Sequence, residues 1–128
     1  MIRWLGFSAL LAAALALAAC SGGTGAASKP AGGGPQTITV NGSDQMRFNP
    51  PSLTVTAGSP VRLTLNDAGA ALVHDFTIDN LGGQRVHIEA QPNSSATGEL
   101  TAPAGTYQFY CAQPGHREAG MQGTLTAR

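Results

Sequence analysis

The sequence predicts an all-β protein, a two-sheet Greek-key β-sandwich of about eight strands. Short segments rich in Val, Ile, Thr, Tyr and Phe recur from Thr37 to the end of the chain, separated by Gly, Pro, Asn and Asp. Several segments alternate apolar with polar residues, as a strand with one buried face does. No stretch of this region has the spacing of an amphipathic helix of ordinary length. Together these features favour a sandwich over an α/β arrangement.

The N-terminal 19 residues are typical of an export signal. Arg3 precedes a largely apolar run over 5–19, which is short for a membrane span. The letters LAAC at 17–20 resemble the bacterial lipobox, in which the cysteine is acylated and becomes the mature N-terminus. The sequence therefore predicts a lipoprotein signal peptide over 1–19 and a lipid on Cys20. The alternative is an ordinary secretory signal that leaves Cys20 unmodified, and both alternatives place the protein outside the cytoplasm.

Residues 20–36 are rich in Gly, Ala and Ser and have no periodic apolar face, so a flexible tether is expected there. One folded domain is expected over 37–128. Through the lipid, the domain would be held at a bacterial membrane, facing the periplasm or the cell surface.

Eight strands are expected in this domain, each bounded by turn residues. In chain order they are TITV (37–40), SLTVTAG (52–58), PVRLTLND (60–67), HDFTID (74–79), QRVHIEA (84–90), SATGELTA (95–102), GTYQFYC (105–111) and GMQGTLTA (120–127). Gly, Pro, Asn and Asp stand at the ends of these segments and between them. The third strand shows the clearest alternation, with Val61, Leu63 and Leu65 on one face and Arg62 on the other.

The same alternation indicates which polar residues point toward the core. His74 shares a strand face with Phe76 and Ile78, whereas Asp75 and Thr77 point the other way. A histidine on an apolar face, at the beginning of its strand, is a candidate ligand.

Two further candidates lie at strand ends, and a third lies between them. Cys111 shares a face with Phe109, and Met121 shares one with Leu125. His116 follows the turn residues Pro114 and Gly115, which would return the chain toward Cys111. Two imidazoles, a thiolate and a thioether can therefore converge. This set is the coordination chemistry of a blue-copper centre, in which the thioether is a weak axial ligand.

The loop CAQPGHREAGM, a Cys-x4-His-x4-Met motif, together with LVHDF upstream, resembles the type 1 copper sites of the cupredoxins, the plastocyanin and azurin family. The loop spacing is most similar to that of auracyanin and rusticyanin. The resemblance covers 37–128 and implies one copper ion. It implies that His74 and His116 are the equatorial nitrogen ligands, Cys111 the thiolate and Met121 the axial ligand.

Two positions differ from the family pattern. Asp75 stands where the family often has Asn or Ser after the first histidine, and Val73 stands where azurin has a glycine, so a four-coordinate site is expected. The backbone N–H groups of Asp75 and Gln113 are expected to donate to the Cys111 sulfur, which would favour a fairly high reduction potential. The remaining histidine, His87, is expected to face solvent or a partner.

The resemblance implies a lipid-anchored blue copper protein that carries single electrons between redox protein partners, as a monomer and with no enzymatic activity. Seven Lys and Arg balance seven Asp and Glu without a basic stripe, so no nucleic-acid partner is expected. A catalytic Cys–His pair would need an accessible thiolate, whereas Cys111 is expected on a core face. The remaining alternative is an extracytoplasmic copper carrier or storage protein.

Overall fold

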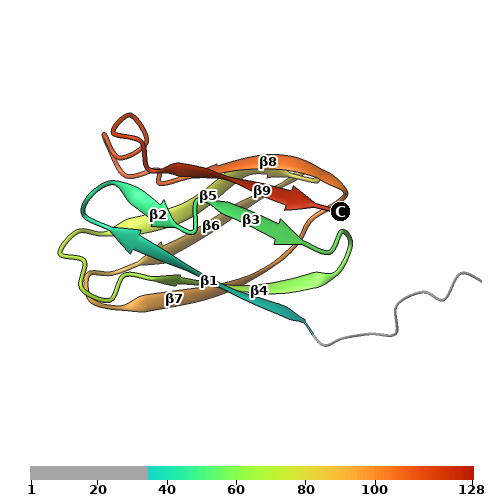
Figure 1. Cartoon of the computed structure of the whole chain (residues 1–128), viewed down its shortest axis with the longest axis horizontal. Coiled ribbons are helices and arrows are strands. Elements are labelled where there is room, and N and C mark those ends of the chain that lie inside the picture. The colour runs from blue at the N-terminus through green and yellow to red at the C-terminus, as the bar shows by residue number, and fades with distance from the viewer. Residues whose placement is uncertain (1–34) are drawn as a thin grey trace, which may run out of the picture. The chain divides into compact units, whose positions relative to one another are not determined.

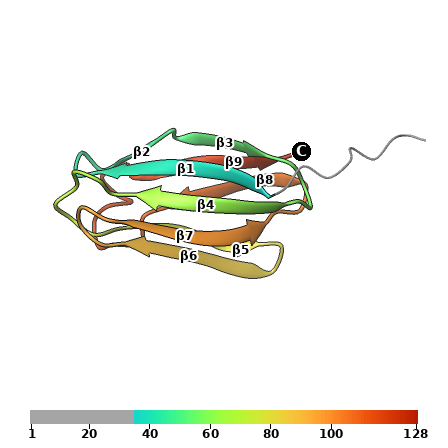
Figure 2. The same ribbon diagram turned by 90° about the horizontal axis from the view of Figure 1, so that it is seen from below.

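The computed structural model describes residues 35–128, which form a sandwich of two β-sheets (Figures 1 and 2). One sheet has four strands in the order β2-β1-β4-β7, and the other has five in the order β3-β9-β8-β5-β6. The strands are β1 (Gln36–Ser43), β2 (Arg47–Asn49), β3 (Ser52–Val55), β4 (Pro60–Asn66), β5 (His74–Leu81), β6 (Gln84–Ala90), β7 (Ser95–Thr101), β8 (Gly105–Tyr110) and β9 (Gln122–Ala127). The predicted all-β sandwich is confirmed.

Strands distant in the sequence lie side by side, as a Greek-key sandwich requires. β1 pairs with β4 and β3 pairs with β9 in parallel, and the other ladders are antiparallel. β4 shows why the alternation predicted its orientation. Val61, Leu63 and Leu65 are completely buried between the sheets, whereas Arg62 is exposed.

The described residues contain nine strands, one more than the sequence predicted. The additional strand is β2, which has three residues and pairs with the second half of β1 after a tight turn in which Met46 has a φ of 56°. Three residues followed by two prolines give no period-2 signal. The strand depends on the partner that β1 offers, and for that reason β1 also extends to Ser43, beyond the predicted residue 40.

The core beneath the functional end of the sandwich is aromatic. The rings of Phe76 and Phe109 stack with centroids 4.6 Å apart, and Phe48 meets Phe109 edge-on at 5.3 Å. Gly123 lies directly against the Phe109 ring, where a Cβ would collide with it. This packing fixes β5, β8 and β9 relative to one another.

β1 gives the domain a direction. At its beginning, the Gln36 side chain bonds the backbone of Thr54 and Thr56, close to the C-terminal residue Arg128. At its other end, β1 leads into the turn that carries Asp44. The beginning of β1 and the C-terminus therefore lie at one end of the strands, and the β1–β2 turn lies at the other (Figure 1).

The predicted signal peptide, the lipid site Cys20 and nearly all of the tether lie outside the described residues. Across residues 35–128, the chain has no helix with the length and apolarity needed to cross a membrane.

Candidate metal centre

The four predicted ligand residues come together at one end of the sandwich. His74 is the first residue of β5, and Cys111 directly follows β8. His116 lies in the loop between β8 and β9, and Met121 immediately precedes β9. In Figure 1 this loop extends beyond the sheets at the end opposite the C-terminus.

Three ligand atoms form a tight cluster. Nδ1 of His74 lies 3.2 Å from Nδ1 of His116, and Sγ of Cys111 lies 3.4 Å from the same His116 nitrogen. All three atoms lie within 4.8 Å of one another. His74 and Cys111 are completely buried and His116 is half-buried, so the cluster is shielded from water except at His116.

Met121 is the fourth predicted ligand residue, and its side chain is completely buried. Its backbone N–H donates to the carbonyl of His116 at 3.0 Å, and its carbonyl accepts the N–H of Cys111 at 3.0 Å. The loop turns sharply at Gly115, with a φ of 82° that favours glycine. Hydrogen bonds along the backbone thus hold Cys111, His116 and Met121 together.

The donor set fits a copper ion. The two imidazole nitrogens face each other at 3.2 Å, and the thiol lies beside them. A cation would let both nitrogens present lone pairs and would replace the thiol proton. Imidazole nitrogens with a thiolate and a neighbouring methionine are the ligands that suit copper in electron-transfer sites.

The Cys111 thiol is buried, and its sulfur also accepts a hydrogen bond from the backbone. The backbone N–H of Asp75 donates to Sγ at 3.3 Å. Burial raises the pKa of the Cys111 thiol to about 11, while the backbone N–H groups of Asp75 and Gln113 lower it. Of the two N–H donors that the sequence predicted, the structure shows the hydrogen bond from Asp75, and the bond from Gln113 stays a prediction. A metal ligand must be the thiolate, so binding requires the loss of this proton.

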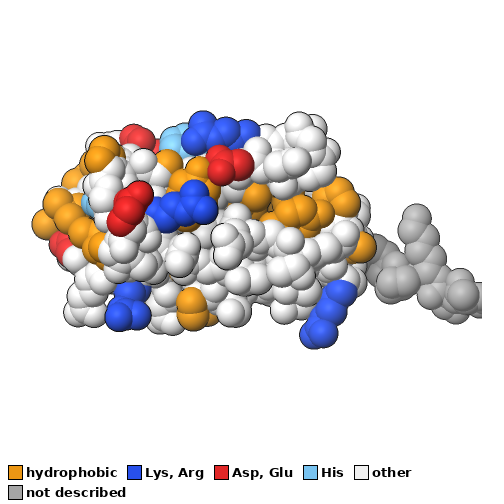
Figure 3. Space-filling model, turned by 90° about the horizontal axis from the view of Figure 1, so that it is seen from above, with side chains coloured by type: hydrophobic (Ala, Val, Ile, Leu, Met, Phe, Trp, Pro, Cys, Tyr) orange, Lys and Arg blue, Asp and Glu red, His pale blue; other side chains and the backbone are white. Residues whose placement is uncertain are grey.

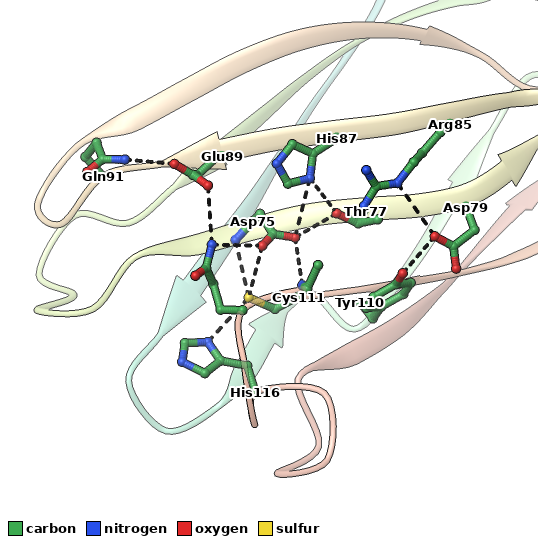
Figure 4. A network of polar contacts seen from close by, with 12 residues as sticks. Asp75, Thr77, Asp79, Arg85, His87, Glu89, Gln91, Tyr110, Cys111 and His116 are labelled. Atoms are coloured by element: carbon green, nitrogen blue, oxygen red, sulfur yellow. Dashed lines mark hydrogen bonds and ion pairs between the residues drawn. The ribbon is translucent and has the colours of Figure 1, made fainter.

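The Asp75 carboxylate connects the two ligand segments (Figure 4). Its Oδ1 accepts the backbone N–H of Ala112 at 2.8 Å and the hydroxyl of Thr77 at 2.7 Å. Its Oδ2 accepts the side-chain amide of Gln113 at 3.3 Å and lies 3.7 Å from Sγ of Cys111. We call residues 111–121, between β8 and β9, the metal loop. Asp75 therefore links β5 to the metal loop, as an amide or hydroxyl side chain does in the expected family pattern. Asp75 and Thr77 point away from the sandwich core, yet both are completely buried, because the metal loop and β6 cover them.

His87 is joined to this network from β6. Its side chain is 41 % exposed, as the sequence led us to expect, and its Nδ1 lies 2.8 Å from the Thr77 hydroxyl. Thr77 gives its only hydroxyl hydrogen to Asp75, so the hydrogen of the second contact must belong to His87 Nδ1. His87 Nδ1 also lies 3.8 Å from Oδ1 of Asp75, so His87 is a surface residue with two buried neighbours, outside the ligand cluster.

Two aspartates next to His74 were not singled out by the sequence as site residues. Asp44 accepts the backbone N–H groups of Ala71 at 2.8 Å and Leu72 at 3.1 Å, and its Oδ1 lies 3.4 Å from Nε2 of His74. The bond from Ala71 is the main cause that lowers the pKa of Asp44. Asp67 is completely buried, and burial raises the pKa of its carboxyl. Both residues look like ordinary turn residues in the sequence, and only the tertiary structure brings them to His74.

His116 is half-buried and is followed by the exposed charged residues Arg117 and Glu118, while exposed apolar residues lie in its own loop and in the loop before His74. Burial is the main cause that lowers the pKa of His116. Leu72 is the one large apolar side chain of the described residues that is prominently exposed, at 42 %, and Ala71 and Pro114 are exposed as well. Ala70, which precedes them in the chain, is only 3 % exposed, and its backbone is bonded to Asp67 and Asn93. Hydrophobic side chains gather at this end in Figure 3.

Comparison with known proteins gave consistent matches. Residues 8–127 match the family model of the cupredoxin-like domain. The chain is 31% identical to auracyanin-A of Chloroflexus aurantiacus, over 97% of this chain and 96% of that protein. It is 32% identical to the copper-resistant cuproprotein CopI of Rubrivivax gelatinosus, over 73% of this chain and 67% of that protein. The crystal structure of dithionite-reduced auracyanin from Roseiflexus castenholzii has the same fold, with a TM-score of 0.64 and 21% identity, over 75% of this chain and 99% of that chain.

Proposed function

The chain belongs to the cupredoxin family of copper electron-transfer proteins, and we propose that it is a lipid-anchored carrier of single electrons between redox partners outside the cytoplasmic membrane. The cofactor is one type 1 copper. We assign His74, Cys111 and His116 as its equatorial ligands and Met121 as the axial ligand.

The observation that carries this proposal is the cluster of three ligand atoms, which lie within 4.8 Å of one another at the end of the sandwich opposite the C-terminus. Copper supplies two oxidation states that differ by one electron and accept nearly the same ligands. The protein supplies rigidity: the backbone bonds among Cys111, His116 and Met121, with the Asp75 bridge, keep the donors in place before a metal arrives. Little rearrangement is then needed when the charge changes.

We propose His116 as the point at which electrons enter and leave, because it is the half-buried member of the cluster. The exposed apolar side chains of Leu72, Ala71 and Pro114 beside it suit brief, weak docking to a redox protein. We expect the protein to act as a monomer and to perform no chemistry on a substrate.

The visible spectrum of the copper-loaded protein tests the metal centre. We expect an intense blue band that ascorbate bleaches, and we expect Cys111→Ser to lose it because oxygen replaces the thiolate sulfur. His87→Gln is the matched control, since His87 lies outside the cluster, and it should keep the band. A colourless wild-type protein that still binds copper would contradict the electron-carrier proposal.

The lipid anchor needs its own experiment. A cell that makes this protein should attach labelled palmitate to it, and the protein should sediment with membranes. Cys20→Ala should lose both the label and the sedimentation while the blue band remains. A wild-type protein that carries no label would leave an ordinary secreted carrier instead.

A copper carrier or storage protein is the second candidate function, favoured by the similarity to CopI. The two functions differ in what leaves the protein. An electron carrier exchanges electrons with an external oxidant or reductant and retains its copper through many cycles. A copper carrier gives up cuprous ion to a chelator at a comparable rate. Measuring both rates on the same sample separates them.

A further inference from the structure

Asp67 is the one described residue whose carboxylate is completely buried and has no hydrogen-bond partner on either oxygen. It follows directly after β4. Its backbone is well bonded, to Ser94 and to Ala70, so the main chain at this position is satisfied without the side chain. A buried carboxylate whose oxygens accept no hydrogen bond is costly for a fold, since it has lost its hydrogen bonds with water. The packing of the described residues gives no reason for an aspartate here.

The Asp67 carboxylate lies beside the His74 imidazole. Both groups pack on Gly42 of β1: a Cβ at that position would collide with Oδ1 of Asp67 and come within 3.2 Å of Cδ2 of His74. The absence of a side chain at Gly42 therefore makes the space that the carboxylate occupies. Cδ2 belongs to the outer edge of the ring, the edge away from the metal-facing nitrogen Nδ1.

Asp44 serves as a contrast on the same edge of the imidazole. It accepts two backbone N–H groups and lies 3.4 Å from His74 Nε2, so its charge is used by the loop before β5. Asp44 also reaches solvent, with a side chain 39 % exposed. Asp67 has neither partners nor solvent.

We propose that Asp67 is the counter-charge of the metal centre, a carboxylate that stabilises the cupric form of the site relative to the cuprous form through His74. The proposal rests on the proposed function, since it requires that copper binds at His74. It names a residue that sets the balance between the two oxidation states and is not itself a ligand.

The cupric form carries one more positive charge than the cuprous form, and a buried carboxylate interacts with that charge through a medium that screens poorly. Imidazole transmits the effect, because a ligand whose outer edge faces an anion is a stronger donor to the metal. Burial raises the pKa of the Asp67 carboxyl, and positive charge at the His74 imidazole opposes that rise. Asp67 therefore acts in the direction opposite to the Asp75 N–H donor at the Cys111 sulfur.

If Asp67 has this role, its replacement should raise the stability of the metal-free protein and weaken the binding of cupric copper, a combination that a purely structural residue would not show. Replacement by the isosteric neutral amide, Asp67→Asn, should stabilise the metal-free protein, since it removes a buried unpaired charge. The same variant should weaken cupric binding more than cuprous binding, and we set the expected difference at about tenfold, the lower end of the affinity losses seen when a group that supports a ligand is changed. For a one-electron couple, that tenfold corresponds to a rise of about 59 mV in the reduction potential.

The experiment compares the full chain and its Asp67→Asn variant at pH 8. The Tm of the metal-free proteins is measured first, and the reduction potentials of the copper-loaded proteins follow. Support requires a higher Tm for the variant, by roughly 4 °C or more, together with a higher potential. Glu99→Gln is the matched control, because it removes the same charge from an exposed site on β7 and should change neither quantity.

Each other outcome overturns the proposal. An unchanged or lower Tm, or a variant that fails to fold, would show that the carboxylate holds the fold together. An unchanged potential would show that its charge does not reach the metal. The wild-type blue band separates this failure from that of the proposed function: if the band is present, copper is bound by the thiolate whatever Asp67 does.

Discussion

Cys111 keeps its proton to an unusually high pH in the metal-free protein. An ordinary thiol has a pKa of 9.0, and burial raises that of Cys111 to about 11. Between these values the thiol of the unfolded chain ionises while that of the folded chain stays protonated. The folded state therefore binds the proton more tightly. The contribution of this thiol to the free energy of unfolding is fully present below pH 9 and is lost as the pH rises through 11.

This linkage gives the first prediction. The metal-free protein should lose about 2 kcal/mol of unfolding free energy between pH 9 and pH 11 because of Cys111. Urea unfolding at several pH values measures the loss. Cys111→Ser is the reference, because serine at position 111 does not ionise in this range. If both proteins show the same pH dependence, the thiol is not the cause.

Asp75 gives the second prediction at this scale. Asp75→Asn keeps the shape but has one acceptor oxygen, so its amide N–H₂ would face the donor groups that the carboxylate now accepts. We expect the metal-free protein to lose about 1–3 kcal/mol, because Gln113 or Ala112 is left without an acceptor. Glu89→Gln is the control, since exposed Glu89 also accepts from Gln113 but should cost little. A loss equal to that of the control would contradict the bridging role of Asp75.

At the scale of the strands, β9 depends on a glycine. A Cβ at Gly123 would collide with the Phe109 ring and with the backbone carbonyl of Pro51. We predict that Gly123→Ala destabilises the fold by about 3 kcal/mol, because the ring is locked between Phe48 and Phe76 and backbone cannot yield. Gly98→Ala in β7 is the comparison, since its Cβ would meet only the flexible end of Ile88. Urea unfolding of both variants should give the larger loss at Gly123, and equal losses would contradict this.

The strands also show what the sequence could predict. In β4 one face is buried and the other exposed, so the alternation in the sequence is visible in the structure. In β5 both faces of His74–Thr77 are buried, because the metal loop and β6 cover the second face. Polar Asp75 and Thr77 therefore gave the pattern of an exposed face in a place that has none. Only the contacts with Ala112 and His87 decide their burial.

The candidate site divides in the same way. Cys111, His116 and Met121 lie within one loop, so their spacing predicts that they meet, and the strand face of His74 adds the fourth residue. The partners of His74 could not be predicted, because Asp44 comes from a turn 30 positions earlier in the chain and Asp67 occupies space left by Gly42. Such contacts depend on how β1 and β4 approach β5.

At the scale of the whole molecule, the centre joins several strands. The proposed ligands belong to the beginning of β5, the end of β8 and the beginning of β9. A bound metal would connect these strands in the folded state alone. We therefore predict that copper raises the stability of the protein, by about 4 kcal/mol at a free concentration one thousand times the Kd. Calorimetry with and without copper measures the effect, and His116→Ala should reduce it; an unchanged Tm would contradict specific binding.

The direction of β1 has a consequence for the cell. The described chain begins beside Thr54, Thr56 and the C-terminus, whereas the metal loop lies at the far end of the strands. A group attached ahead of Gln36 is therefore joined to the domain at the end opposite His116. A protein held from that side would present His116, the proposed point of electron transfer, to partners that approach from the aqueous side. A fusion partner or a surface linker could be attached at the same end without blocking electron transfer.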